Sequence, residues 1–472
     1  MSAKSRRLRT LLTRLPVIST LMELDAGPRA FIYFITFNLI SWQCVVGPTL
    51  VLFARKIEMP ESRVGLLMAF VPISMILVIL TGLIVIRFGP KRVILVSWFL
   101  RNLMVCSVFL MPWAIVEFGT GAAGFVLMIS TLGFCLMRAV GAGGWMPWLH
   151  EIVPEKQRSS YFSAEAAISN LLAVGLTAAQ GLILHGNPGI WRFLAVYGIG
   201  VVAGFVSLLL LRRVPGGKPS PATPGDSESA FKPHLSALRD RPYVTFIVFA
   251  GFCFASMSWF NSAVVLYMRD ALQVSPGLIL YLTAFGSAAI MLTIGFWGRY
   301  ADHAGGPHAL ALSLSSAALM SFGCMLVLPG MKGMIYALAA VLITFAVFNS
   351  AFWATINRTM LDYLNPAERV GYSNLWTVFC AIGASATPII AGFIIDHFGM
   401  LGYRTCFLIG AVSSFACAIA SLYVIKRERD FEFPWKQCPF YELPFRFIFS
   451  VAQISVGLHH SNRPGSSRKR DE

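Results

Sequence analysis

Three charged residues interrupt long apolar stretches of the chain, and their chemistry needs an explanation. Arg138 lies in LMRAVGAGGW, Glu165 in FSAEAAIS and Arg101 in WFLRNLMV. A charge within hydrocarbon costs at least about 2.5–3.5 kcal/mol on insertion scales, so each should have a compensating partner. Two interpretations of Arg138 stay open: contact with a solute or coupling ion, and an internal ion pair with Glu165. For Arg101 we expect a structural role, with its long side chain reaching the inner interface.

Neutral polar residues lie on the same kind of stretch, and two tryptophans recur among them. They are Asn38, Gln43, Asn261 and Asn349, together with Trp42 and Trp259. Such side chains suit a mixed polar and aromatic cavity for a small molecule. They equally suit hydrogen bonds and packing between helices, and the sequence does not decide between the two.

Long apolar segments must position these residues. The chain has 472 residues, of which 56% are hydrophobic and 13% charged, against about 25% charged in soluble domains. Segments of about 20 apolar residues recur, each long enough to cross a bilayer as a helix. We predict an all-α polytopic membrane protein with twelve spans, near 30–53, 64–86, 93–115, 120–145, 162–184, 190–211, 243–268, 276–297, 309–329, 334–358, 372–395 and 402–425.

The basic residues are unevenly distributed between these spans. The net charge is +16, but Lys and Arg gather in alternate loops, as Arg87, Lys91 and Arg92 do after the second span. This bias follows the positive-inside rule and predicts that both termini are cytoplasmic. It argues for the bilayer rather than a nucleic acid as the partner. The short loops favour a bacterial inner membrane.

The composition also divides the chain into five parts. Residues 213–241 are rich in Pro, Gly and Ser, which predicts a flexible cytoplasmic linker. The first residues are basic with leucines at helical spacing, which suits an interfacial helix or a disordered tail. The predicted parts are a basic amphipathic segment 1–28, a six-helix bundle 29–212, the linker 213–241, a second bundle 242–425, and a partly interfacial or disordered tail 426–472.

The two predicted bundles resemble each other. Gly181 and Gly392 lie 211 positions apart, as do Tyr161 and Tyr372. Other matches follow in the same order at offsets of 211 to 217. A duplicated six-helix unit of this kind is typical of transporters, in which two similar bundles move around a shared site.

The loops after the second and eighth spans carry a shared motif. The copies read Gly298, Asp302, His303 and Gly305, and Gly82, Ile86, Arg87 and Gly89. With the twelve spans and the central linker, the chain resembles the major facilitator superfamily. The resemblance implies two pseudo-symmetric six-helix bundles joined by a cytoplasmic linker, a cavity lined by the fourth helix, and no cofactor.

The same resemblance implies a gate at the cytoplasmic side. Asp302 would meet the start of the fifth helix, near Arg158, where free N–H groups stabilise a carboxylate by about 0.3–2 kcal/mol. Gly298, Gly305, Gly82 and Gly89 would allow tight turns and close approach. The other gate residues would be the pairs Glu151 with Arg158 and Asp362 with Arg369, joined by Arg87 and His303. The alternative is that these residues set topology and cap helices.

Together these features predict a transporter. The sequence lacks GxSxG, GxxxxGK[ST] and HExxH motifs, and its nine cysteines show no metal-ligand spacing, so an enzyme is not indicated. We predict alternating-access transport of a small organic solute, secondary active or facilitative, with a lean toward anionic or zwitterionic solutes. A coupling proton or ion stays open. The alternative is a non-transporting sensor or assembly factor on the same fold.

Overall fold

The computed structural model describes residues 24–154, 157–219, 234–365 and 368–425. Side chains at several helical positions, Arg158, Asp302, His303 and Arg369 among them, lie outside what it describes. The predicted segment 1–28 is therefore described only from residue 24, and the predicted tail 426–472 lies outside the described residues.

Six spans make up the first half of the chain. Span one is α3 (Ala26–Val45) and α4 (Pro48–Lys56), span two is α5 (Glu61–Ser74), η1 (Met75–Leu77) and α6 (Val78–Phe88), and span three is α7 (Pro90–Cys106), η2 (Ser107–Leu110) and α8 (Met111–Phe118). Spans four to six are α9 (Thr120–Ile152), α10 (Arg158–Ile183) and α11 (Ile190–Arg212).

Six further spans make up the second half. They are α13 (Arg241–Leu266) with the π-helical turn η4 (Tyr267–Ala271), α14 (Pro276–Ala304), α15 (Gly306–Leu326), α16 (Met334–Asp362), α17 (Arg369–Phe398) and α18 (Met400–Val424). Twelve helices of the described residues are long and apolar enough to cross a membrane, which confirms the predicted spans. The eighth helix continues to Ala304, beyond its predicted end, so the second copy of the loop motif is mostly helical and turns at Gly305.

The first span is broken where the sequence places Gly47 before Pro48. Gly47 has a φ of 107°, a region that other residues rarely adopt, and α4 restarts with Pro48 at its first turn. Pro48 therefore stands at the start of a new helix, where its missing N–H breaks no helical hydrogen bond. Pro388, by contrast, lies within the continuous helix α17.

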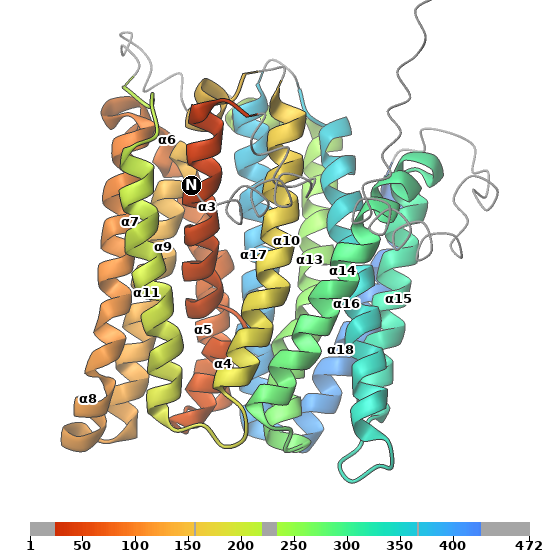
Figure 1. The fold of residues 1–472 in the computed structure, drawn as a ribbon. Coiled ribbons are helices and arrows are strands. Elements are labelled where there is room, and N and C mark those ends of the chain that lie inside the picture. The colour runs from red at the N-terminus through yellow and green to blue at the C-terminus, as the bar shows by residue number, and fades with distance from the viewer. Residues whose placement is uncertain (1–23, 155–156, 220–233, 366–367, 426–472) are drawn as a thin grey trace, which may run out of the picture.

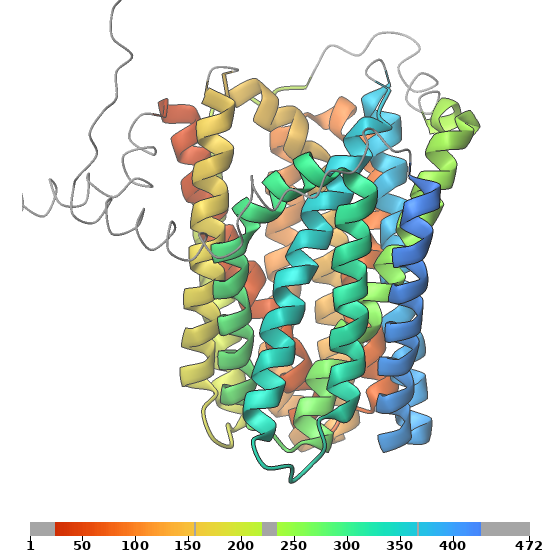
Figure 2. The same cartoon turned by 90° about the vertical axis from the view of Figure 1, so that its right-hand side faces the viewer.

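The halves lie side by side, with the first half drawn red to yellow-green and the second green to blue in Figure 1. They meet along two helix pairs, α5 with α17 and α10 with α14. In Figure 1, α10 and α14 are adjacent at the bottom and diverge toward the top, where α11 ends. We call the top, where α11 ends at Arg212, the linker end, and the bottom the far end; Figure 2 shows the same arrangement from the side of the second half.

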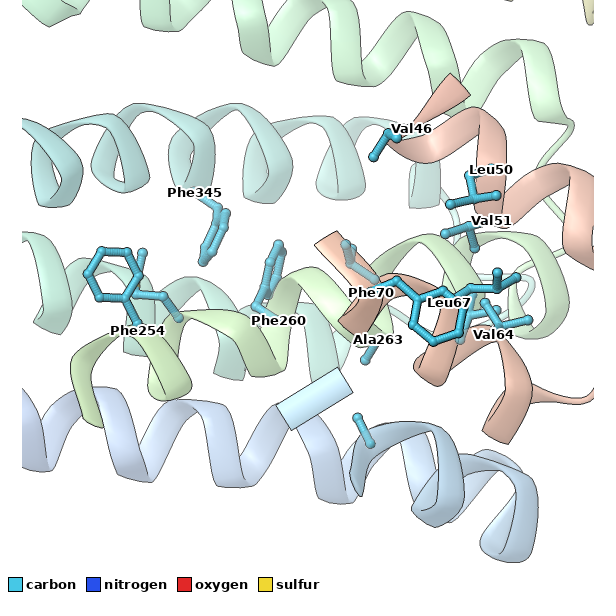
Figure 3. Packing of buried hydrophobic residues seen from close by; sticks show 14 of the residues in the cluster. Val46, Leu50, Val51, Val64, Leu67, Phe70, Phe254, Phe260, Ala263 and Phe345 are labelled. Carbon is cyan, nitrogen blue, oxygen red and sulfur yellow. The ribbon is translucent and has the colours of Figure 1, made fainter. Parts of the chain in front are cut away.

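One buried apolar cluster crosses between the halves. Figure 3 shows Val64, Leu67 and Phe70 of α5 in the same cluster as Phe260 and Ala263 of α13. Two further clusters each stay within one half: one contains Trp98, Trp148 and Val214, and the other contains Trp297, Tyr300 and Ala351. Shared apolar packing of the described residues therefore joins the halves mainly along the far part of the molecule.

Candidate functional site

Two adjoining cavities lie between the halves. The first has a volume of about 330 Å³ and is lined by α4, α5, α13, α14 and α16. The second, of about 450 Å³, is lined by α5, η1, α9, α13, α16 and α17. Met68, Val71 and Asn261 line both, so the two cavities lie against each other. Each volume lies within the range typical of small-molecule sites.

Arg138 of α9 reaches the second cavity. Its guanidinium carbon lies 4.1 Å from the ring centroid of Trp42, close enough for a cation–π contact. Its Nη1 lies 3.5 Å from the sulfur of Met75. Among the ion pairs of the described residues, none joins Arg138 to Glu165. The structure therefore places the arginine against an aromatic face, and not against the carboxylate that was one of its two predicted partners.

Arg101 is buried inside the first half. Its side chain is 1% exposed, so the predicted reach to the interface is wrong. The guanidinium carbon lies 4.8 Å from the ring centroid of Trp98 and 4.9 Å from that of Phe134. Nη2 donates to Oδ1 of Asn102 at 3.4 Å, whereas Nε has no hydrogen-bond partner. The aromatic faces hold the cation in place of the interface.

The two arginines belong to one stack. Trp42 stacks on Phe134 with ring centroids 5.9 Å apart, so the order is Arg138, Trp42, Phe134, Arg101. Neither arginine has a carboxylate within ion-pair distance among the described residues. The first half thus holds two cations that are balanced by aromatic faces and by no described acid.

The other predicted cavity residues divide into two groups. Asn261 and Asn349 line the first cavity. Trp259 lines neither cavity. It lies on the face of α13 that points away from them, with its Cβ close to Gly410 of α18. Neither cavity is lined by Glu165, Asn38 or Gln43; Asn38 Oδ1 is buried without a partner, and the Gln43 carbonyl accepts from Gln180 Nε2 at 3.0 Å.

A charged cluster that the sequence analysis missed joins the halves at the far end. Arg55, at the end of α4, lies 2.9 Å from Glu61 through Nη2 and 2.9 Å from Asp270 of η4 through Nε. Tyr403 donates to Oδ2 of Asp270 at 3.4 Å. A signal was available, since Arg55 and Asp270 end equivalent spans of the repeat and carry opposite charges.

Glycines bring the helix backbones together near the same end. A Cβ at Gly65 of α5 would overlap the carbonyl oxygen of Pro388 in α17, and would lie 3.1 Å from the Cα of Gly392. A Cβ at Gly181 of α10 would lie 3.2 Å from the carbonyl oxygen of Gly277 in α14. Both helix pairs that join the halves therefore have a contact that only a small residue permits.

At the linker end, residues 213–218 form a strap against the first half. Trp148 Nε1 donates to the carbonyl of Pro215 at 2.9 Å, and the Gly217 N–H donates to Oε2 of Glu151 at 2.8 Å. Lys91 Nζ donates to the carbonyl of Val214 at 2.5 Å. The start of the predicted flexible linker is therefore held against the first half. Its carbonyls accept hydrogen bonds from Trp148 and Lys91, and the Gly217 N–H donates to the carboxylate of Glu151. Glu151 faces this strap; the side chain of its predicted partner Arg158 lies outside the described part.

The rest of the predicted cytoplasmic gate is only partly described. The backbones of Gly298, Asp302 and His303 lie in α14, and Gly305 ends that helix with a φ of 76°. Asp362 lies 3.7 Å from Arg358 of its own helix, while the side chain of Arg369 is outside the described part.

The first copy of the motif is fully placed. Gly89 has a φ of 79° and a Cβ there would lie 2.9 Å from the carbonyl oxygen of Gly217, so the turn and the strap both require glycine. Gly82 is exposed, and a Cβ there would have no neighbour within 4 Å. No other segment therefore packs closely against Gly82, contrary to its predicted role. Arg87 is exposed beside Phe88, 5.4 Å from its ring.

The fold and the central cavity define a polytopic membrane protein of two six-helix halves, the architecture of transporters that work around a shared site. A model of the Major Facilitator Superfamily matches residues 30–348 and 333–454. The chain belongs to this superfamily of transporters. No protein with a curated description matches the sequence.

Several solved transporters share the fold. The nucleoside transporter NupG is 13% identical, with a TM-score of 0.62 over 88% of this chain and 100% of its own. A variant of the peptide transporter POT with alafosfalin is also 13% identical, with a TM-score of 0.65 over 88% of this chain and 97% of its own. A bacterial homolog of the human lysosomal transporter Spinster is 14% identical, with a TM-score of 0.57 over 85% and 96%. At these identities the similarity concerns the fold alone.

Proposed function

We propose that this protein carries a small organic solute across the membrane by alternating access, as a facilitator or a secondary active transporter. The observation that supports this most directly is a cavity lined by a partly buried cation, Arg138, placed between two halves that touch through the Arg55–Asp270 ion pair. A site between two movable halves can face each side in turn. The solute is anionic or zwitterionic, because the cavity presents a positive charge.

The structure supports a state in which the far end is closed. The Arg55–Asp270 pair, the shared apolar cluster and the glycine contacts all join the halves there. The apolar clusters that contain Trp148 and Trp297, nearer the linker end, are separate. For the solute to leave at the far end, those contacts must separate and the linker end must close.

The predicted cytoplasmic gate would hold that second state. Asp302 near the end of α14 would meet the start of α10 near Arg158, and Asp362 would pair with Arg369. Gly298 and His303 belong to the same stretch of α14. Arg87, beside Gly89, would add charge on the opposite half. The glycine turns at Gly89 and Gly305 support this proposal, because both end their helices at the linker end.

We place the linker end in the cytoplasm of a bacterial cell and the protein in its inner membrane. The excess of basic residues in the loops at that end supports this orientation. A coupling proton or ion would bind outside the cavities, because their described lining contains no carboxylate. No catalytic step is needed for such a function.

The test uses the full-length protein in proteoliposomes. Anions, amino acids, sugars, nucleosides, lipids and cationic drugs are screened for thermal stabilisation, which follows from binding to the folded state. The best solute is then followed as labelled uptake with and without the unlabelled solute inside. Faster uptake in exchange is expected of alternating access. A ligand that binds and never crosses would instead support a non-transporting sensor or assembly factor.

A further inference from the structure

We infer that the solute is an amphipathic monoanion, with an apolar body in the first cavity and one anionic group at Arg138. This inference rests on the proposed function, since it names the class of solute that the two adjoining cavities would carry. The charge balance, the use of polar groups and the shape of the lining each support it.

The charge balance favours a single anionic group. Of the residues that line the two cavities in the described structure, Arg138 is the one with a charge. It lies on Trp42 without a described carboxylate, and Arg101 adds a second positive charge behind Phe134. A guanidinium group has only hydrogen-bond donors. It therefore gains most from an anionic group that only accepts hydrogen bonds, such as a carboxylate or sulfonate. A zwitterion would bring an ammonium group for which the lining provides no carboxylate.

The hydroxyl groups of the lining are already committed. Each donates its proton to a backbone carbonyl: Ser258 to Ala384, Ser262 to Ser258, Thr377 to Ser373, Thr283 to Ile279, and Ser287 to Thr283. Asn261 donates through Nδ2 to the carbonyl of Met257. A polyhydroxylated solute would therefore lose its bonds to water and find few free donors, at about 1–3 kcal/mol for each group left unpaired.

The first cavity suits an apolar body. Its surface comes mainly from aliphatic and aromatic side chains, of which Val51, Met68, Val264, Leu282 and Phe345 are representative. The second cavity adds Trp353 and Trp376 on the side of the second half. With Asn261 at the junction of the two cavities, a solute can place its charge at Arg138 and its apolar part beyond Asn261.

The experiment is a binding series on the unaltered full-length protein in lipid nanodiscs. Calorimetry compares naphthalene-2-sulfonate with its neutral sulfonamide, the cation 2-naphthylmethylammonium, the zwitterion 2-naphthylalanine, and methanesulfonate, which lacks the apolar body. We expect naphthalene-2-sulfonate to bind at least tenfold more tightly than each of the others. Equal or tighter binding of the neutral, cationic or zwitterionic compound overturns the inference.

Matched variants locate the anionic group. Arg138→Gln should weaken binding of naphthalene-2-sulfonate at least tenfold, and Arg138→Lys should recover part of that loss. Arg92→Gln, which removes an exposed cation from α7, is the control for charge and for partition into lipid. Unchanged binding in folded Arg138→Gln protein overturns the inference. If that variant does not fold, the compound series on the unaltered protein still decides.

Binding and flux separate this inference from the proposed function. Tight, Arg138-dependent binding of the sulfonate with no exchange of any solute in proteoliposomes would sustain the anion site and remove the transporter proposal. Exchange of a solute that lacks an anionic group would sustain transport and overturn the monoanion.

Discussion

Arg55 and Asp270 form an ion pair that joins the two halves of the protein, with Nε of Arg55 2.9 Å from Oδ2 of Asp270. Arg55 also lies 2.9 Å from Glu61 of its own half. If the halves separate, Arg55 keeps one carboxylate and Asp270 keeps its contact with Tyr403. Separation therefore strands neither charge, and this reduces the cost that breaking a partly buried pair normally carries.

Neutralising this pair should weaken closure of the far end. Asp270→Asn is expected to lower the stability of the closed state by about 1 kcal/mol, or about fivefold in population, since the two side chains are 18% and 22% exposed. Distances between spin labels at Gly189→Cys and Lys332→Cys, both in far-end loops, would show a larger open fraction. Glu117→Gln, an exposed acid of α8, is the control and should change nothing.

A double-mutant cycle of Arg55→Gln and Asp270→Asn then isolates the pair. We expect the double variant to shift the label distances no further than Asp270→Asn does alone. Additive shifts would show that each residue acts through other neighbours, and the ion pair would not be the closing contact.

Glycine substitutions should follow the contacts of each position. Gly65→Ala is expected to prevent the closed contact with Pro388 and to increase the open fraction most strongly, because the new Cβ would overlap backbone. Gly181→Ala should have a smaller effect, since its nearest neighbours are at 3.1–3.2 Å. Gly82→Ala has open space and should only raise helix stability, by up to about 1 kcal/mol. The same spin labels and thermal unfolding rank the three; any other order contradicts the packing described.

The elements of the fold were predictable because their signals are local. Twelve apolar segments must form helices in a bilayer, and Gly47–Pro48 interrupts hydrogen bonding wherever it lies in a helix. The positions of Trp259 and Arg101 were not predictable in this way. Trp259 sits on the face of α13 toward α18, and Arg101 sits between Trp98 and Phe134. Both depend on how a helix is rotated against its neighbours, which one sequence does not specify.

The strap should be stabilised by hydrogen bonds that the composition of 213–241 did not reveal. Trp148→Phe removes the donor to the Pro215 carbonyl while it keeps an aromatic ring, and should lower the free energy of unfolding by about 1 kcal/mol. Hydrogen exchange at the amides of Val214 and of residues 216–218 should rise at the same time. Lys218→Ala, at an exposed position, is the control. Unchanged exchange in Trp148→Phe would mean that the strap is held by other contacts.

Arg101 should destabilise the folded protein once Trp98, one of its two aromatic partners, is removed. Trp98→Leu takes away the ring 4.8 Å from the guanidinium and leaves a buried charge with Nε already unpartnered. A cation–π contact in a dry site is worth about 2 kcal/mol, so the thermal midpoint should fall by more than the lost apolar area explains. Adding Arg101→Met removes the charge and keeps most of the side-chain length. The double variant should therefore be more stable than Trp98→Leu alone, because a buried charge that has lost one of its two aromatic partners is replaced by an apolar group. Thermal unfolding of the two single variants and the double variant measures this. A double variant less stable than Trp98→Leu would show that Arg101 has a stabilising partner other than the aromatic stack.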